Sequence, residues 1–257
     1  KSRKNAKRRK EIMAGKSSEP MMVKGKRLDG RKTNEMRPMK IKMGVVPQAV
    51  GSAEFSMGKT TVVAAVYGPK EVHPRHMMIP DRALIRVKYD MLPFSTTDRI
   101  RPGPNRRSKE ISKVMSSALE AAVYTKKYPA TVIDIFVQIT NANAGTRTAA
   151  INAASAALAH AGIEMRDLVC SVAAGKADGT VMLDLFQPED NGGEADLPVA
   201  IMPKTMGITL IQMDGDLTKK EFAESMKLVN EAMPVLYDLQ KKALINGEAS
   251  FEGGKIK

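Results

Sequence analysis

Short segments in which apolar and polar residues alternate recur along most of this chain, and single segments of helical spacing separate them. Alternation with period two is typical of a half-buried β-strand, because successive side chains point to opposite faces of a sheet. The clearest case is 131–140, with Ile133, Ile135, Val137 and Ile139. Further strands are expected at 41–43, 52–57, 60–67, 84–89, 168–175, 180–186, 197–202 and 208–213.

Helical spacing appears three times between these strands. Apolar residues recur at intervals of three and four within 110–124, and 149–160 is a run rich in alanine that ends near Gly162. Thr218 and Glu221 form a capping-box pattern that opens a long C-terminal helix. Blocks of strands divided by single helices predict an α+β fold, with mixed sheets packed against a few helices.

The net charge of +13 is concentrated at one end of the 257 residues. Segment 1–27 holds eleven Lys or Arg against only Glu11 and Glu19. So many charges with so few apolar residues predict a disordered tail, acting either as an RNA-binding arm or as a solvated extension. We expect the folded domain to span 28–246 and 247–257 to be loose. The basic excess favours a nucleic-acid partner.

Cysteine content and hydrophobicity indicate the compartment. Cys170 is the single cysteine, which excludes an internal disulfide and a CxxC zinc site, and its apolar surroundings predict a buried structural thiol. No apolar run approaches the roughly 20 residues that a membrane span needs, and the basic N-terminal segment lacks the apolar core of a signal peptide. These features predict a soluble, cytoplasmic protein.

A candidate anion site lies at 141–148, between a predicted strand and a predicted helix. The free N–H groups of a helix's first turn favour an anion. Gly145 lets the backbone approach it closely, Thr146 offers a hydroxyl group and Arg147 can bind two phosphate oxygens. The same pattern also fits a capped helix with a surface arginine. It is not a P-loop, since no GxxxxGK[ST] occurs.

Two further segments carry chemistry-bearing side chains. Asp190 and Asp196 stand six residues apart across a Gly-Gly bend, where converging carboxylates could hold a divalent cation or raise one partner's proton affinity. An acidic surface loop is the alternative. The loop 98–107 carries four arginines and resembles a surface that follows a phosphate backbone, or else a solubilising loop. Sparse aromatic residues argue against base-specific stacking.

Taken together and in this order, these motifs resemble the RNase PH superfamily, most closely the catalytic RNase PH-type subunits of archaeal exosome cores. The resemblance covers about residues 26–245. Asn141 and Asn143 stand where such proteins usually carry aspartates, which removes charge near the phosphate site. The stretches that carry the resemblance are 28–38, 67–76, 101–107 with 110–113, 144–147, 162–168, and 189–196 with 198–203.

The resemblance implies an RNase PH-type fold and a phosphorolytic exoribonuclease. Inorganic phosphate would attack the 3′-terminal phosphodiester of single-stranded RNA and release a nucleoside diphosphate, reversibly. The resemblance implies that Gly145, Thr146 and Arg147 bind phosphate. It implies catalysis by Asp190 and Asp196, which together would also bind Mg²⁺ or Mn²⁺. RNA contacts are implied at Arg75, Arg106, Arg107 and Arg99.

The resemblance also implies partners. An inactive RNase PH-type homologue would alternate with this chain in a six-membered ring, and RNA-binding cap proteins would guard its entrance. Two other functions stay open: a non-catalytic RNA-binding scaffold of such a ring, and a homohexameric RNase PH that trims tRNA 3′ ends. Retention of Arg147, Asp190 and Asp196 favours the catalytic role over the scaffold.

Overall fold

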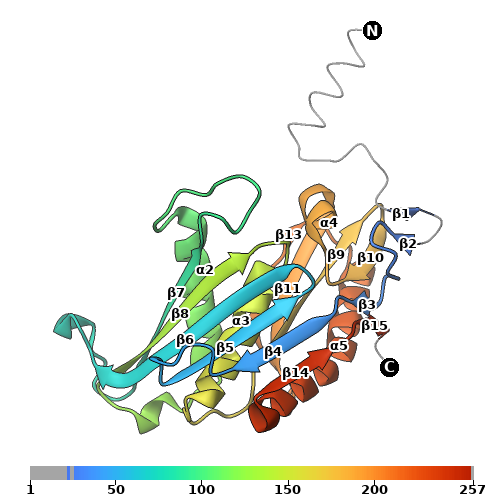
Figure 1. Ribbon diagram of the computed structural model, residues 1–257. Helices are drawn as coiled ribbons and strands as arrows, with labels where there is room; N and C mark the ends of the chain where they lie inside the picture. The colour runs from blue at the N-terminus through green and yellow to red at the C-terminus, as the bar shows by residue number, and fades with distance from the viewer. Residues whose placement is uncertain (1–21, 24–25, 256–257) are drawn as a thin grey trace.

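A computed structural model describes residues 22–23 and 26–255 of the chain. Most strands belong to two sheets. The first has six strands in the order β14-β4-β5-β6-β8-β7, and the second has five, in the order β10-β9-β11-β12 with β13 paired to β11. Helices pack on and between the sheets (Figure 1), so the predicted α+β architecture is confirmed.

The strands of the first sheet come from the N-terminal half and the extreme C-terminus, whereas those of the second come from the C-terminal half. The first sheet contains β4 (Met39–Met43), β5 (Gly51–Met57), β6 (Thr60–Glu71), β7 (Leu84–Met91), β8 (Thr131–Asn141) and β14 (Glu248–Phe251). The second contains β9 (Cys170–Ala177), β10 (Thr180–Leu183), β11 (Ala195–Met202), β12 (Gly207–Ile211) and β13 (Asp214–Gly215).

Short paired strands and helices complete the fold. Two-stranded ribbons join β1 (Met22–Val23) to β2 (Lys26–Arg27) and β3 (Glu35–Met36) to β15 (Gly254–Lys255). The helices are α2 (Arg106–Glu120), α3 (Thr146–His160), α4 (Gln187–Gly192) and α5 (Lys219–Asn246), with 3-10 turns η1 (Arg75–Met77) and η2 (Thr125–Lys127).

Helix α3 lies between the two sheets (Figure 1). It contacts β5 and β6 of the first sheet and β9 and β11 of the second. Twelve of its fifteen residues are buried, and six of these are alanines, whose small side chains allow strands to approach from both sides. A Cβ on Gly51 of β5 would lie 2.3 Å from the backbone nitrogen of Ala161, just after the helix. The C-terminal end of α3 is thus packed closely against β5, and its N-terminal end follows β8 after a loop of four residues.

The outer helices cover the remaining sheet faces. Helix α2 buries Ile111, Met115 and Leu119 and packs on β7, and the order β7-α2-β8 links two parallel neighbouring strands. Helix α5 packs on β9, β10 and β14. It opens with the predicted capping box, because the Thr218 hydroxyl accepts a hydrogen bond from the Glu221 N–H while Glu221 accepts one from the Thr218 N–H.

The C-terminal residues differ from the sequence-based expectation of a loose segment over 247–257. Helix α5 is followed by Gly247, whose φ of +83° is readily adopted only by glycine. The chain reverses there, Glu248–Phe251 pairs antiparallel with β4, and Gly254–Lys255 pairs with β3. A four-residue edge strand has too short an alternation to be recognised in a sequence.

The described chain also begins earlier than the predicted domain boundary at residue 28. Residues 1–21 and 24–25 of the predicted tail lie outside the described residues. Arg27, which the sequence placed in the solvated tail, has a fully buried side chain that is paired with Glu189. Arg27 can be buried because Glu189 pairs with its charge. Glu189 is 162 residues away in the sequence, so the composition around Arg27 does not predict this pair.

Cys170 is buried in β9, as predicted, and burial raises the pKa of its thiol well above the ordinary value. Across residues 22–23 and 26–255, none of the helices combines the length and apolar character that crossing a membrane requires.

Candidate active site

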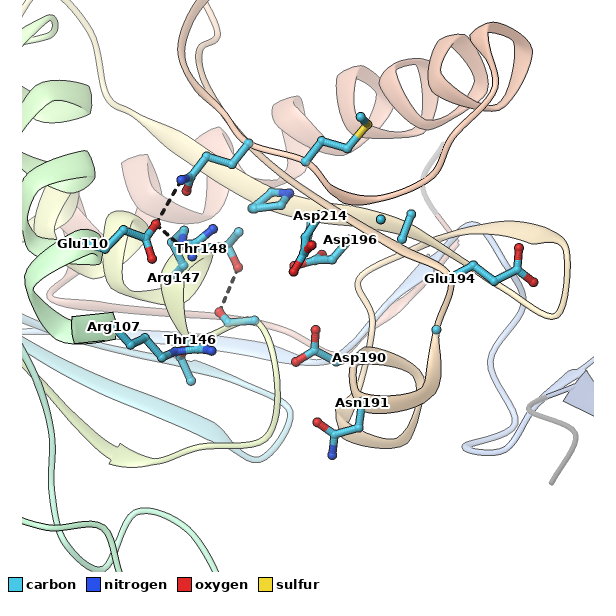
Figure 2. A pocket seen from close by; sticks show the side chains of 18 residues that line it. Arg107, Glu110, Thr146, Arg147, Thr148, Asp190, Asn191, Glu194, Asp196 and Asp214 are labelled. Carbon is cyan, nitrogen blue, oxygen red and sulfur yellow. Dashed lines mark hydrogen bonds and ion pairs between the residues drawn. The ribbon is translucent and has the colours of Figure 1, made fainter. Parts of the chain in front are cut away.

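A cleft of about 650 Å³ opens where four elements meet. The first turn of α3 and the first turns of α2 form one side, while α4 and the β11–β13 pair form the other (Figure 2). Residues from all three sequence-predicted segments line it, since Thr146 and Arg147 face Asp190 and Asp196 across the opening, and Arg107 lies at one end.

The loop before α3 is shaped by its backbone. Ala144 and Gly145 both adopt positive φ angles, of +59° and +64°. A Cβ on Gly145 would lie 2.8 Å from the Met57 side chain, so only glycine fits there without a shift of its neighbours. The Thr60 hydroxyl donates to the Ala144 carbonyl at 2.8 Å and accepts from the Asn143 N–H at 3.0 Å, which ties the loop to β6.

The first residues of α3 offer several hydrogen-bond donors to an anion. The N–H groups of Thr146 and Arg147 precede the first backbone hydrogen bond of the helix, which Ala149 donates to Gly145. Tyr89 donates to the Thr146 hydroxyl at 3.0 Å, so the proton of that hydroxyl is available to another acceptor. Within the described residues the buried Nε of Arg147 has no hydrogen-bond partner, as expected of a donor that serves a ligand.

Three carboxyl groups approach the same space from different elements (Figure 2). Asp190 lies on α4, and Asp196 of β11 pairs directly with Asp214 of β13. Burial, followed by the neighbouring Asp190 carboxylate, raises the pKa of Asp196 to about 7. Although Asp190 meets solvent on one side, the surrounding protein desolvates it and raises its pKa, against the opposing effect of Arg107 and other cations.

These carboxyl groups fit a divalent cation that is also held by a substrate. Within the described residues no group of three or more His, Cys, Asp or Glu side chains is arranged to hold a metal ion by itself. Asp190 and Asp196 nevertheless repel each other enough to raise a pKa, and a cation between them would relieve that repulsion. Mg²⁺ is commonly bound by one or two carboxylates together with substrate phosphates, which matches this donor set.

The predicted RNA-binding arginines do not all come together. Arg107 lines the cleft, and Arg106 precedes it as the first residue of α2. Arg99 lies in the loop before α2, and Arg75 lies in η1 of the β6–β7 connection, at the far side of the molecule from α4 in Figure 1. Neither Arg99 nor Arg75 lines the cleft, and their contacts with RNA stay predictions.

Several site features escaped the sequence. The segment 188–196, expected to be a loop, contains helix α4, whose six residues are too few to show helical periodicity. Asp214 precedes a glycine in a short segment with no strand pattern, yet strand pairing places it beside Asp196. Glu110 accepts a hydrogen bond from Gln212 at 3.1 Å and another from Arg147 at 3.5 Å, and the sequence assigned it no role although it lies in the family stretch 110–113.

Donors for an anion, facing carboxyl groups and a flanking arginine are suited to a substrate that carries phosphate groups. Comparison with known proteins gives the family. Residues 35–164 match the 3′ exoribonuclease family, domain 1, and residues 167–229 match domain 2 of the same family. The chain belongs to this 3′ exoribonuclease family, known as the RNase PH family.

Curated relatives agree with this assignment. The exosome complex component Rrp41 of Methanopyrus kandleri is 57% identical over 220 residues, covering 86% of this chain and 92% of that protein. Rrp41 of Pyrococcus furiosus is 56% identical, covering 86% and 88%, and Rrp41 of Archaeoglobus fulgidus is 48% identical, covering 88% and 89%.

Solved structures share the fold. Rice Rrp46 superposes with a TM-score of 0.77 at 23% identity, covering 86% of this chain and all of that one. A chain of the Archaeoglobus fulgidus exosome with RNA bound to the active site gives a TM-score of 0.72 at 25% identity, covering 84% and 92%. The RNase PH-type fold inferred from the sequence motifs is therefore confirmed.

Proposed function

We propose that this chain is a phosphorolytic 3′-to-5′ exoribonuclease subunit that shortens single-stranded RNA with inorganic phosphate. One observation carries the proposal: the anion donors of Thr146 and Arg147 and the carboxyl groups of Asp190 and Asp196 face each other across a single cleft. An enzyme of this kind needs two anionic groups side by side, the attacking phosphate and the terminal phosphodiester of the RNA.

In the proposed reaction the first turn of α3 holds the phosphate ion. An oxygen of this ion forms a bond to the terminal RNA phosphorus while the bond from that phosphorus to the preceding 3′ oxygen breaks. The products are a nucleoside diphosphate and an RNA shorter by one nucleotide. Asp190, whose pKa is raised in the cleft, delivers a proton to the departing 3′ oxygen. The reverse reaction adds nucleotides from nucleoside diphosphates.

Divalent cation binding is the second part of the proposal. Asp190 and Asp196 would hold Mg²⁺ or Mn²⁺, which would supply positive charge between two phosphates that otherwise repel each other. Arg107, at the end of the cleft, would contact the RNA backbone beside the scissile bond, with Arg106 next to it. Arg99 and Arg75, outside the cleft, would contact RNA further from that bond.

Assembly into an exosome-type ring is supported by the Rrp41 relatives. The edge strand β12 and its flanks expose apolar side chains, with Ile208 and Ile211 51% and 44% accessible and Met213 54% accessible. Such a strand edge is suited to burial against a neighbouring subunit. We propose that an RNase PH-type homologue alternates with this chain in a six-membered cytoplasmic ring that carries RNA-binding cap proteins.

The proposal is tested by product analysis. The full chain, alone and mixed with its RNase PH-type homologue, is incubated with a 5′-labelled single-stranded RNA, with and without phosphate. We expect nucleoside diphosphates to appear only when phosphate is present, and equal degradation without phosphate would refute the proposal. A stable, active oligomer of the chain alone would instead favour the homohexameric form.

A matched pair of variants tests the role of Asp190. Asp190→Asn should lower turnover at least 100-fold, as expected when a general acid is lost, while RNA binding stays within about twofold. Asp216→Asn is the control, because Asp216 is also an exposed aspartate but lies outside the cleft. Turnover of Asp190→Asn equal to that of the control would remove Asp190 from this role.

A further inference from the structure

The segment 27–37 directs three arginine side chains into the turn that precedes α4. This turn comprises residues 183–186, and Asp184 at its centre is buried with a φ of +53°. The Leu-Asp-Gly-Arg motif of this segment belongs to the family resemblance, yet none of its residues lines the cleft. The three arginines of the segment thus contact residues that lead into the cleft and not the cleft itself.

Arg27 secures helix α4. Its guanidinium group forms a two-point ion pair with Glu189, with Nε lying 2.7 Å from Oε1, and also donates to the carbonyl oxygens of Leu183 at 2.6 Å and Asp184 at 2.8 Å. A six-residue helix is not stable by its own backbone hydrogen bonds. Because Asp190 follows Glu189 directly, the position of its carboxyl group depends on this ion pair.

Arg37 links the turn before α4 to residues 142–145 before α3, the phosphate-binding loop of the proposed function. Its Nη2 donates to Asp184 at 2.7 Å and its backbone N–H donates to the same carboxylate at 2.8 Å. At the other end of the guanidinium group, Nη1 donates to the carbonyl oxygen of Asn143 at 2.7 Å. The lack of a side chain on Gly145 makes room for it, because a Cβ there would lie 3.0 Å from Nη2.

Arg37 thus connects the two segments that lead into opposite sides of the cleft. The loop at Asn143 leads into the phosphate donors of α3, and the turn at Asp184 leads into the helix that carries Asp190. The side chain of Arg37 is only 6% exposed. The rigid, planar guanidinium group sets the separation of the two segments, whereas a lysine ammonium group has a single nitrogen and cannot reach both partners in this way.

We propose that Arg37 is a positioning residue that holds the phosphate-binding loop in register with the carboxylate helix α4. The proposal rests on the function proposed above, because that function requires the phosphate ion and Asp190 to lie at a fixed separation. The structure also offers a matched control. Arg31 donates to the same Asp184, through its carboxylate at 3.3 Å and its carbonyl at 3.2 Å, but its hydrogen bonds do not extend to the phosphate-binding loop.

The experiment compares Arg37→Lys with Arg31→Lys in the full chain, assembled as the wild type is for its RNA-degradation assay. Steady-state rates are measured over a range of phosphate concentrations at saturating RNA, and over a range of RNA concentrations at saturating phosphate. Far-UV circular dichroism and sizing establish that each variant is folded and assembled. Thermal midpoints show how much stability each substitution removes.

We expect Arg37→Lys to lower kcat/KM for phosphate by about 10- to 100-fold, since a misplacement of about 1 Å can cost that much. KM for RNA should stay within twofold, because the RNA-binding arginines of α2 are untouched. Arg31→Lys should keep both parameters within about threefold of the wild type even where its thermal midpoint falls as far as that of Arg37→Lys.

Two results would overturn the proposal. Either Arg37→Lys keeps wild-type kinetics for phosphate, or both variants lose activity in proportion to their loss of stability. If Arg37→Lys does not fold, Arg37→Gln, which retains one amide donor, replaces it under the same criteria. Failure of the proposed function is separate and is seen in the wild type alone, as RNA degradation that does not depend on phosphate.

Discussion

Replacing Asp184 by asparagine removes one negative charge from the ion pairs with Arg37 and Arg31, where Asp184 itself is buried, and changes almost no volume. In the wild type, this carboxylate accepts hydrogen bonds from the side chain and backbone of Arg37 and from Arg31. An asparagine amide has one acceptor oxygen, and its NH₂ group would face a donor. The substitution therefore leaves the buried guanidinium group of Arg37 without its counter-charge.

The expected cost follows from that geometry. Removing one partner of a buried ion pair typically costs about 3–5 kcal/mol, because the remaining charge stays desolvated. For a chain of this size, each kcal/mol corresponds to about 2–4 °C in the unfolding midpoint. We therefore expect Asp184→Asn to lower the thermal midpoint by about 6–20 °C at neutral pH, measured by circular dichroism in the same oligomeric state as the wild type.

The pH dependence of stability provides a second test of the same prediction. Although burial opposes ionisation, Arg37 and Arg31 hold the pKa of Asp184 below its ordinary value of 3.8. A carboxyl group whose folded pKa is depressed stabilises the fold above its unfolded pKa, and this stabilisation disappears as the pH falls through the folded pKa. The difference between wild type and Asp184→Asn should thus be constant from pH 8 to 5 and shrink only below about pH 4.

An exposed aspartate on α5 provides the control. Asp238→Asn makes the same chemical change at the surface and should alter stability by less than about 0.5 kcal/mol. If Asp184→Asn were as stable as Asp238→Asn at pH 7, the buried arginine cluster would contribute nothing to the fold, and the reasoning above would be refuted.

Three further outcomes are expected. Gly145→Ala should raise KM for phosphate at least tenfold in steady-state assays, because the φ of +64° strains an alanine and its Cβ would lie 2.8 Å from the Met57 side chain and 3.0 Å from Nη2 of Arg37. An unchanged KM would argue against the loop geometry. Deleting 1–21, which removes eight Lys or Arg, should reduce the salt dependence of RNA binding without lowering the thermal midpoint, whereas deleting 1–27 should lower both. Chelating divalent cations should slow phosphorolysis far more than RNA binding, and equal loss of both would count against a cation in the reaction.

Periodicity in the sequence was sufficient to predict the long elements. The alternation in 131–140 and the capping box at Thr218 report on contacts within a few residues, and β8 and α5 form where those patterns predict them. Helix α4 and strand β14 are different, because each is short and depends on distant partners. Arg27 holds α4, and β4 holds Glu248–Phe251.

The same distinction applies to the site. Gly145 and Arg147 are recognisable because a strand, a glycine and a helix start follow one another in the sequence. Asp214 could not be recognised, because it joins the cleft only through the pairing of β13 with β11 opposite Asp196. Arg37 is hidden in another way, since it lies outside the cleft and affects it through Asp184 and Asn143. A single sequence does not show which residues far apart along the chain pair or contact each other in the fold.

The candidate cleft is rich in carboxyl groups although the chain as a whole is strongly basic. Arg107 and Arg147 face Asp190, Asp196 and Asp214 there, so the carboxyl groups outnumber the arginines. Burial is the main cause of the raised pKa values of Asp190 and Asp196, and neighbouring carboxyl groups raise them further. Two incoming phosphates would increase this repulsion. This repulsion falls when one carboxyl group carries a proton or when a divalent cation lies between two of them. The proposed acid and the proposed cation site therefore involve the same pair of residues.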